Sequence, residues 1–135
     1  MKGTTQAKTR LGDAFGPHRP RLALAFARDT VTAAMNCSLV ADVTVTTGDP
    51  SAAAAFAGAG AHVFEDAASD GLNAAISVAV RELPRLRDAS GIAVLLGDLP
   101  ALTPSALERA LELAGSHDVA FVPDAKDSGT TLLCA

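Results

Sequence analysis

Apolar and polar positions along the chain alternate between the spacing of strands and the spacing of helices. Short apolar or β-branched runs, typical of strands, occupy residues 42–47, 61–65, 92–97, 118–123 and 130–134. Stretches with helical spacing or a high alanine content occupy residues 20–36, 51–58, 71–83 and the region that Thr103 and Pro104 open. Strands that alternate with helices across short connections predict an α/β fold, with a mostly parallel sheet between helices on both faces.

The segment 92–97 is apolar throughout, as in a strand that is buried on both faces of a parallel sheet.

The two ends of the chain do not follow the alternation of strands and helices. Residues 1–19 are polar, so the helix expected at 20–36 has no apolar strand before it, and the last residues fall within the strand expected at 130–134. We therefore expect a single incomplete domain, residues 1–135, without its first strand and a C-terminal portion. Such a chain is expected to be unstable or inactive by itself.

Composition narrows the classes of function. Of the 135 residues, 49% are apolar and 19% are charged, which is typical of a folded domain. The net charge of −4 argues against nucleic acid as a partner, because phosphate binding depends on clustered Lys and Arg. Apolar runs are far shorter than the roughly 20 residues that cross a bilayer, and the N-terminus lacks the apolar core of a secretory signal. We expect a cytoplasmic protein with two reduced cysteines and no membrane segment; its oligomeric state is not predicted.

The N-terminal segment KGTTQAKTRL, residues 2–11, combines Gly and Thr with three cations, Lys2, Lys8 and Arg10. A loop of this kind before a helix suits a triphosphate, because loop amides and cations together neutralise phosphate charge. The segment does not have the GxxxxGK[ST] spacing of a P-loop. A solvated basic N-terminus is the alternative interpretation.

The segment LGDLPAL, residues 96–102, contains Asp98 directly after the apolar run 92–97. Open α/β sheets bind ligands at the carboxyl ends of their strands. A carboxylate at such a place suits Mg²⁺, which prefers oxygen ligands and substrate phosphates. The alternative is an Asp that caps the turn before Pro100.

The segment DGLNAA, residues 70–75, opens the helix expected at 71–83. Asp70 or Gly71 is the expected cap of this helix, and the amide of Asn73 could contact a base or a ribose. The alternative is an ordinary helix start with an exposed Asn.

The segment PDAKDSGTTL begins at Pro123, so Asp124 also follows an expected strand. Its candidate donors to an anion are Lys126, Ser128, Gly129, Thr130 and Thr131. The alternative is a hairpin turn built from Asp, Ser and Gly.

These four motifs, in this order, resemble one family, the CofC/FbiD guanylyltransferases, which make an intermediate of coenzyme F-420. The resemblance spans residues 2–134. It implies a nucleotidyltransferase-like, Rossmann-like fold and an enzyme that moves GMP from GTP onto the phosphate of a three-carbon acid, with release of pyrophosphate. That acid is phosphoenolpyruvate or 2-phospho-L-lactate, and the Ala- and Arg-rich composition favours phosphoenolpyruvate.

The resemblance also implies roles for individual residues. Lys2, Lys8 and Arg10 would stabilise the triphosphate and the departing pyrophosphate. Asn73, with the backbone of Gly71, would contact the guanosine.

The resemblance also implies that Asp98 holds Mg²⁺ that bridges phosphates, and that Thr130 holds the phosphate of the acceptor acid. Gly129 would let the backbone approach that phosphate. Two alternatives remain: an inactive truncated relative, and a related nucleotidyltransferase of the molybdopterin guanylyl- or cytidylyltransferase type.

Overall fold

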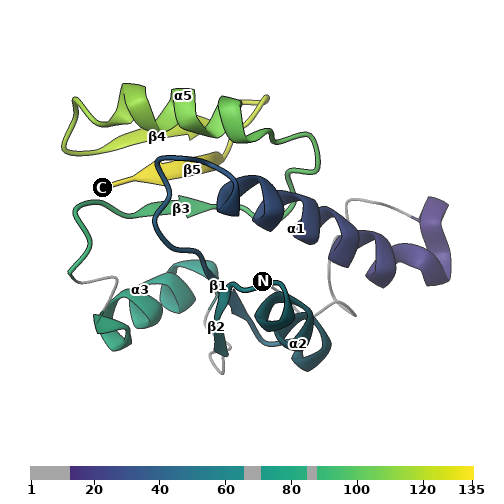
Figure 1. Ribbon diagram of the computed structural model, residues 1–135. Coiled ribbons are helices and arrows are strands. Elements are labelled where there is room, and N and C mark those ends of the chain that lie inside the picture. The colour runs from purple at the N-terminus through teal and green to yellow at the C-terminus, as the bar shows by residue number, and fades with distance from the viewer. Residues whose placement is uncertain (1–12, 66–70, 85–87) are drawn as a thin grey trace.

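The computed structural model describes residues 13–65, 71–84 and 88–135 (Figure 1). Its helices are α1 (Arg19–Met35), α2 (Pro50–Gly58), α3 (Leu72–Glu82) and α5 (Pro104–Ala114), with a 3-10 segment η2 (Asp13–His18) before α1. Its strands are β1 (Thr44–Thr47), β2 (His62–Glu65), β3 (Ala93–Leu95), β4 (Ala120–Pro123) and β5 (Thr130–Cys134). Each expected helix and strand is present, with ends displaced by a few residues. None of the helices in these ranges is long and apolar enough to span a bilayer.

Local sequence fixes the start of several helices. A proline stands in the first turn of α1, α2 and α5, where a missing N–H breaks no helical hydrogen bond. The Asp49 carboxylate accepts a hydrogen bond from the backbone N–H of Ser51 at 2.8 Å, which caps α2. The hydroxyl of Thr103 accepts one from the N–H of Ala106 at 3.2 Å, so the cap predicted for α5 is confirmed.

The described strands form two sheets. β1 pairs in parallel with β2, and α2 connects them. The other sheet has the order β3-β5-β4, and both of its pairs are antiparallel. β3 and β4 therefore run in the same direction on either side of β5, and α5 connects them (Figure 1).

The predicted α/β class is confirmed. The sequence predicted a mostly parallel sheet, whereas β5 pairs in the antiparallel direction with both β3 and β4. The cause is the short turn 124–129 between β4 and β5, which returns the chain along the strand it has just left. A turn of this length joins antiparallel strands, because a parallel pair needs a crossover of roughly a dozen residues or more. Helical crossovers do connect β1 to β2 and β3 to β4, as the sequence predicted.

Helix α1 belongs to both hydrophobic clusters of the protein. One cluster contains Ala27, Val31, Val45, Ala52, Phe56 and Ala61. The other contains Cys37, Leu107 and Leu132, with Ala34 of α1 packed against it. In Figure 1, α1 accordingly lies between α5 with the three-stranded sheet and α2 with the two-stranded sheet. It is therefore an element that fixes the two sheets relative to each other.

Strand β3 is less buried than its apolar sequence predicts. Ala93 is exposed, and Val94 and Leu95 are only half-buried. One edge of β3 pairs with β5, and no strand of the described ranges pairs with the other edge. The same sheet exposes 64% of Phe121 and 40% of Leu133, which lie opposite each other on one face. The expectation of a strand buried on both faces is therefore not met in the described residues.

The two cysteines are free thiols, as expected. Cys37 is buried beside Leu107 and Leu132. Burial raises the pKa of the Cys134 thiol, which disfavours its thiolate form.

Candidate functional site

Asp98 lies in the segment that leaves the carboxyl end of β3, and its side chain is exposed. The backbone of this segment is anchored from another part of the fold. The N–H of Leu99 donates a hydrogen bond of 3.0 Å to the hydroxyl of Thr30 on α1. A carboxylate thus stands at the strand end where open α/β sheets bind ligands, on a backbone that a packed helix holds.

The carboxyl ends of β3 and β4 lie at the same edge of their sheet, on the right in Figure 1. The N–H of Leu96 donates to the carbonyl of Thr131 at 3.2 Å, so the β3 ladder continues beyond Leu95. Asp98 follows two residues after Leu96, and Thr130 precedes Thr131. The structure therefore brings Asp98, the predicted metal ligand, and Thr130, the predicted acceptor-binding residue, to the same end of the sheet.

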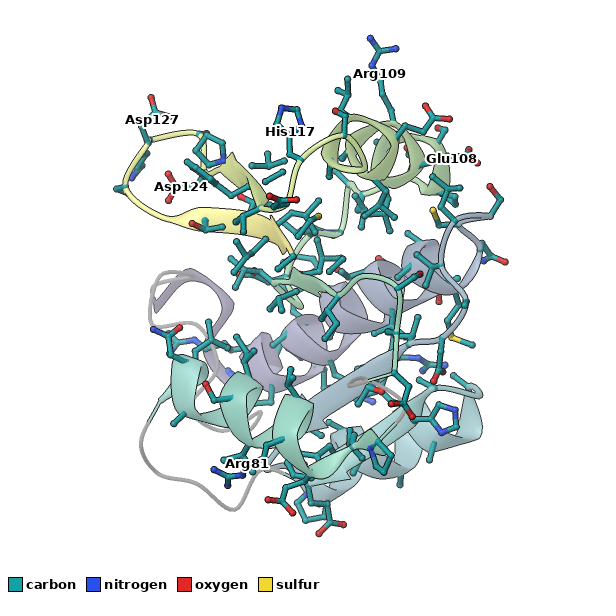
Figure 2. The ribbon with its side chains drawn as sticks, turned by 90° about the vertical axis from the view of Figure 1, so that its left-hand side faces the viewer. Arg81, Glu108, Arg109, His117, Asp124 and Asp127 are labelled. Carbon is teal, nitrogen blue, oxygen red and sulfur yellow. The ribbon has the colours of Figure 1, made fainter. Side chains whose placement is uncertain are left out.

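The turn between β4 and β5 is organised by Asp124 (Figure 2). Its carboxylate accepts hydrogen bonds from the N–H of Ser128 at 2.9 Å, the N–H of Lys126 at 3.0 Å and the hydroxyl of Ser128 at 3.2 Å. The Asp124 N–H donates to the carbonyl of Gly129 at 2.8 Å. The backbone hydrogen bond from Ser128 is the main cause that holds the pKa of Asp124 below its ordinary value. These hydrogen bonds occupy the oxygens of the Asp124 carboxylate. The segment therefore forms the hairpin turn that the sequence indicated as the alternative to an anion-binding segment.

Gly129 has a structural reason to be glycine. A Cβ at this position would lie 3.0 Å from the Asp124 Oδ2, closer than real Cβ contacts normally come. A side chain here would therefore need the Asp124 carboxylate to give way by a few tenths of an ångström. The predicted approach of the Gly129 backbone to an acceptor phosphate stays a prediction, as does the role of Thr130, whose side chain is exposed at the start of β5.

Gly71 and Asn73 lie at the start of α3, which packs against β1 of the other sheet. Gly71 is the N-cap residue, and its φ of 95° favours glycine. Asn73 stands in the first turn with an exposed side chain, while its carbonyl accepts a hydrogen bond from the Ser77 hydroxyl at 2.8 Å. The predicted helix start is confirmed, and the contact of Asn73 with a nucleotide stays a prediction.

Lys2, Lys8 and Arg10 lie outside the described residues, so their predicted contact with a triphosphate stays a prediction. In the described ranges, no group of three or more His, Cys, Asp or Glu side chains is arranged to hold a metal ion. A single carboxylate such as Asp98 fits Mg²⁺, which keeps several waters and is bound through one or two carboxylates plus substrate phosphates. Asp98 therefore fits as a ligand to a metal that arrives with a nucleotide.

Sequence reasoning missed Thr30, although a signal for it existed. Ala23, Ala27 and Val31 are buried at helical spacing on α1, and Thr30 lies on the same stripe. A buried polar residue on the apolar face of a helix needs a hydrogen-bond partner, and its hydroxyl can serve a neighbouring element as well as its own helix. The sequence could not reveal that this partner is Leu99, 69 residues away.

A sequence model of the MobA-like NTP transferase domain family matches residues 21–135, most of the chain. A protein named phosphoenolpyruvate guanylyltransferase from Streptosporangium roseum is 49% identical over 97% of this chain and 59% of its own length. Proteins of the same name from Streptomyces avermitilis and Thermomonospora curvata are 48% and 45% identical over 100% and 98% of this chain. These relatives confirm the resemblance that the four motifs indicated. The chain spans about 60% of the length of these relatives.

A solved structure of CMP:2-keto-3-deoxy-manno-octonic acid synthetase complexed with CTP has a similar fold. Its TM-score is 0.58 at 15% sequence identity, over 82% of this chain and 60% of the other. This likeness supports the nucleotidyltransferase-like arrangement of the strands and helices. Because the family model covers residues 21–135 and the fold agrees with it, the chain belongs to the family of MobA-like NTP transferase domains.

Proposed function

We propose that this chain is part of a cytoplasmic phosphoenolpyruvate guanylyltransferase of coenzyme F-420 biosynthesis, which uses GTP as the donor. The observation that carries the proposal is the identity of 45–49% to relatives named phosphoenolpyruvate guanylyltransferase over nearly the whole chain. Asp98 and Thr130 lie at the same end of the sheet. Their closeness supports the proposal, because the donor nucleotide and the acceptor acid must meet at one place.

In the proposed reaction, a phosphate oxygen of phosphoenolpyruvate attacks the α-phosphorus of GTP. The bond from that phosphorus to the oxygen bridging to the β-phosphate breaks, and pyrophosphate leaves. Such a transfer needs positioning and charge neutralisation more than covalent help from the protein. Lys2, Lys8 and Arg10 are proposed to bind the triphosphate and to stabilise the departing pyrophosphate.

The described residues are proposed to divide the two substrates between them. The Asn73 amide and the Gly71 backbone bind the guanosine at the start of α3. Thr130 donates a hydrogen bond to the acceptor phosphate. Asp98 holds Mg²⁺, which when bound neutralises phosphate charge.

The match to the MobA-like family supports a second candidate, a nucleotidyltransferase of the molybdopterin guanylyl- or cytidylyltransferase type. The two candidates differ in the acceptor and, for the cytidylyl type, in the donor. An inactive relative that only binds nucleotide is a third. Product analysis separates all three.

The test uses the purified chain and a chimera in which this chain replaces the matched segment of the Streptosporangium roseum relative. Each is incubated with Mg²⁺, GTP or CTP, and phosphoenolpyruvate, 2-phospho-L-lactate or molybdopterin, and the products are identified by mass spectrometry. We expect the guanylylated acid and pyrophosphate from GTP and phosphoenolpyruvate in the chimera. The unaltered relative is the positive control. An inactive chimera beside an active relative contradicts the proposed function.

A further inference from the structure

Thr30 is a buried polar residue in the middle of α1, with only 2% of its surface exposed. Its hydroxyl donates a hydrogen bond of 2.8 Å to the Phe26 carbonyl one turn earlier, as helical Thr residues often do. The same oxygen accepts the 3.0 Å hydrogen bond from the Leu99 N–H. A hydroxyl can donate and accept at once, so Thr30 satisfies both neighbours.

The bond to Leu99 acts next to the proposed metal ligand. Leu99 directly follows Asp98, and its carbonyl accepts a hydrogen bond of 3.0 Å from the Leu102 N–H, which closes the turn after β3. Fixing the Leu99 amide restricts the backbone from which the Asp98 side chain extends. Removing the Thr30 hydroxyl would leave the Leu99 N–H without its acceptor, which is costly for a part-buried group.

Helix α1 is well suited to hold this turn. It belongs to both hydrophobic clusters, so its position depends on packing against both sheets. In the sequence, α1 also follows the cationic segment 2–11. A side chain fixed by such an element can place a distant group to within the tolerance that ligand binding requires.

We propose that Thr30 is a positioning residue, whose hydroxyl holds the Leu99 backbone and so places the Asp98 carboxylate for a metal–nucleotide complex. This inference rests on the proposed function. The competing explanation is a purely structural role, in which Thr30 contributes to folding and has no effect on the binding of metal with nucleotide.

The test compares three variants of the chimera described above. Thr30→Val keeps the shape of the side chain and removes the hydroxyl, whereas Thr30→Ser keeps the hydroxyl. Thr32→Val makes the same change at an exposed position of the same helix and is the matched control. The readouts are amide hydrogen exchange at Leu99 by NMR, Mn²⁺ binding in the presence of GTP by EPR, and thermal unfolding.

We expect Thr30→Val to accelerate exchange at Leu99 and to weaken Mn²⁺ binding with GTP by about tenfold, the factor that corresponds to one lost hydrogen bond. Thr30→Ser and Thr32→Val should stay within about twofold of the unaltered chimera, because Thr32→Val keeps Thr30 and Thr30→Ser keeps a hydroxyl at that position. If Thr30→Val does not fold, Thr30→Ala is measured in its place.

Two results overturn the inference. One is a Thr30→Val variant that loses thermal stability but keeps its affinity for Mn²⁺ with GTP; Thr30 is then structural only. The other is a Thr30→Ser variant that binds as weakly as Thr30→Val, because the hydroxyl is then not the group that matters. An unaltered chimera that binds no Mn²⁺ with GTP contradicts the proposed function itself, so the two failures are distinguishable.

Discussion

Asp98 and Asp124 follow two strands of one sheet, β3 and β4, which run in the same direction and end at the same edge. Their surroundings differ. The Asp124 carboxylate accepts hydrogen bonds from Lys126 and Ser128 of its own turn. The turn of Asp98 is held from outside instead, through the backbone of Leu99.

The difference separates a structural carboxylate from a candidate ligand. A carboxylate whose oxygens are occupied by its own turn stabilises that turn, and its hydrogen bonds would have to break before it could bind a metal. The Asp98 side chain is exposed and extends from a backbone that is held from outside its own turn, so a metal can reach it from solvent. The four predictions below test this division.

The largest effect is expected from Asp98→Asn in the chimera. It should reduce guanylyl transfer on the order of a hundredfold or more, since a preorganised charge at the reacting phosphates is lost. The thermal unfolding temperature should change little, because the side chain is exposed. The measurement is initial rate by mass spectrometry.

Asp124→Asn is the control for this change, and it should keep most of the transfer activity. Full activity of Asp98→Asn would show that Asp98 only caps a turn. The division between the two aspartates would then be wrong.

The second prediction concerns cations. Lys8→Ala and Arg10→Ala should each weaken GTP binding about tenfold, the loss expected for one charge-assisted hydrogen bond. Lys126→Ala, in the turn of Asp124, should leave GTP binding unchanged and is the matched control. Calorimetric titration of the chimera with GTP measures all three. Equal losses for all three variants would indicate a general effect of net charge.

The third prediction concerns the turn itself. Gly129→Ala should displace the Asp124 carboxylate by a few tenths of an ångström and weaken its hydrogen bonds, because the new Cβ would lie 3.0 Å from Oδ2. We expect the thermal unfolding temperature of the chimera to fall by about 2–4 °C, the shift that a cost near 1 kcal/mol produces at this size. Gly115→Ala is the control, since its Cβ would meet nothing closer than 3.5 Å. Equal unfolding temperatures for both variants would show that a Cβ at position 129 costs no stability, contrary to this prediction.

Local sequence patterns predicted the strands, the helices and the helix starts. These signals, such as the apolar runs and the Thr103-Pro104 pair, act within a few residues of the chain. The direction of β5 was not predicted, because pairing partners are chosen by tertiary contacts. By sequence alone, Asp98 and Asp124 look alike, because each is an Asp that follows an expected strand. In the structure, the contact of Leu99 with Thr30 and the contact of Asp124 with Ser128 distinguish the two turns, and the Thr30 contact spans 69 residues.

The smallest effect is expected from pH. The hydrogen bond from the Ser128 backbone lowers the pKa of Asp124 in the folded chain, relative to the unfolded value of about 3.9. The ionised carboxylate therefore stabilises the folded state fully above that unfolded pKa, and this contribution is lost as the pH falls through the folded pKa. Because Asp124 is only half-buried at the surface, solvent screens its hydrogen bonds and the change in stability is small. The difference in unfolding temperature between the unaltered chimera and Asp124→Asn should be constant from pH 7 to about 5 and should shrink below about 4. A difference that grows as the pH falls would mean that the protonated acid is the form the turn stabilises.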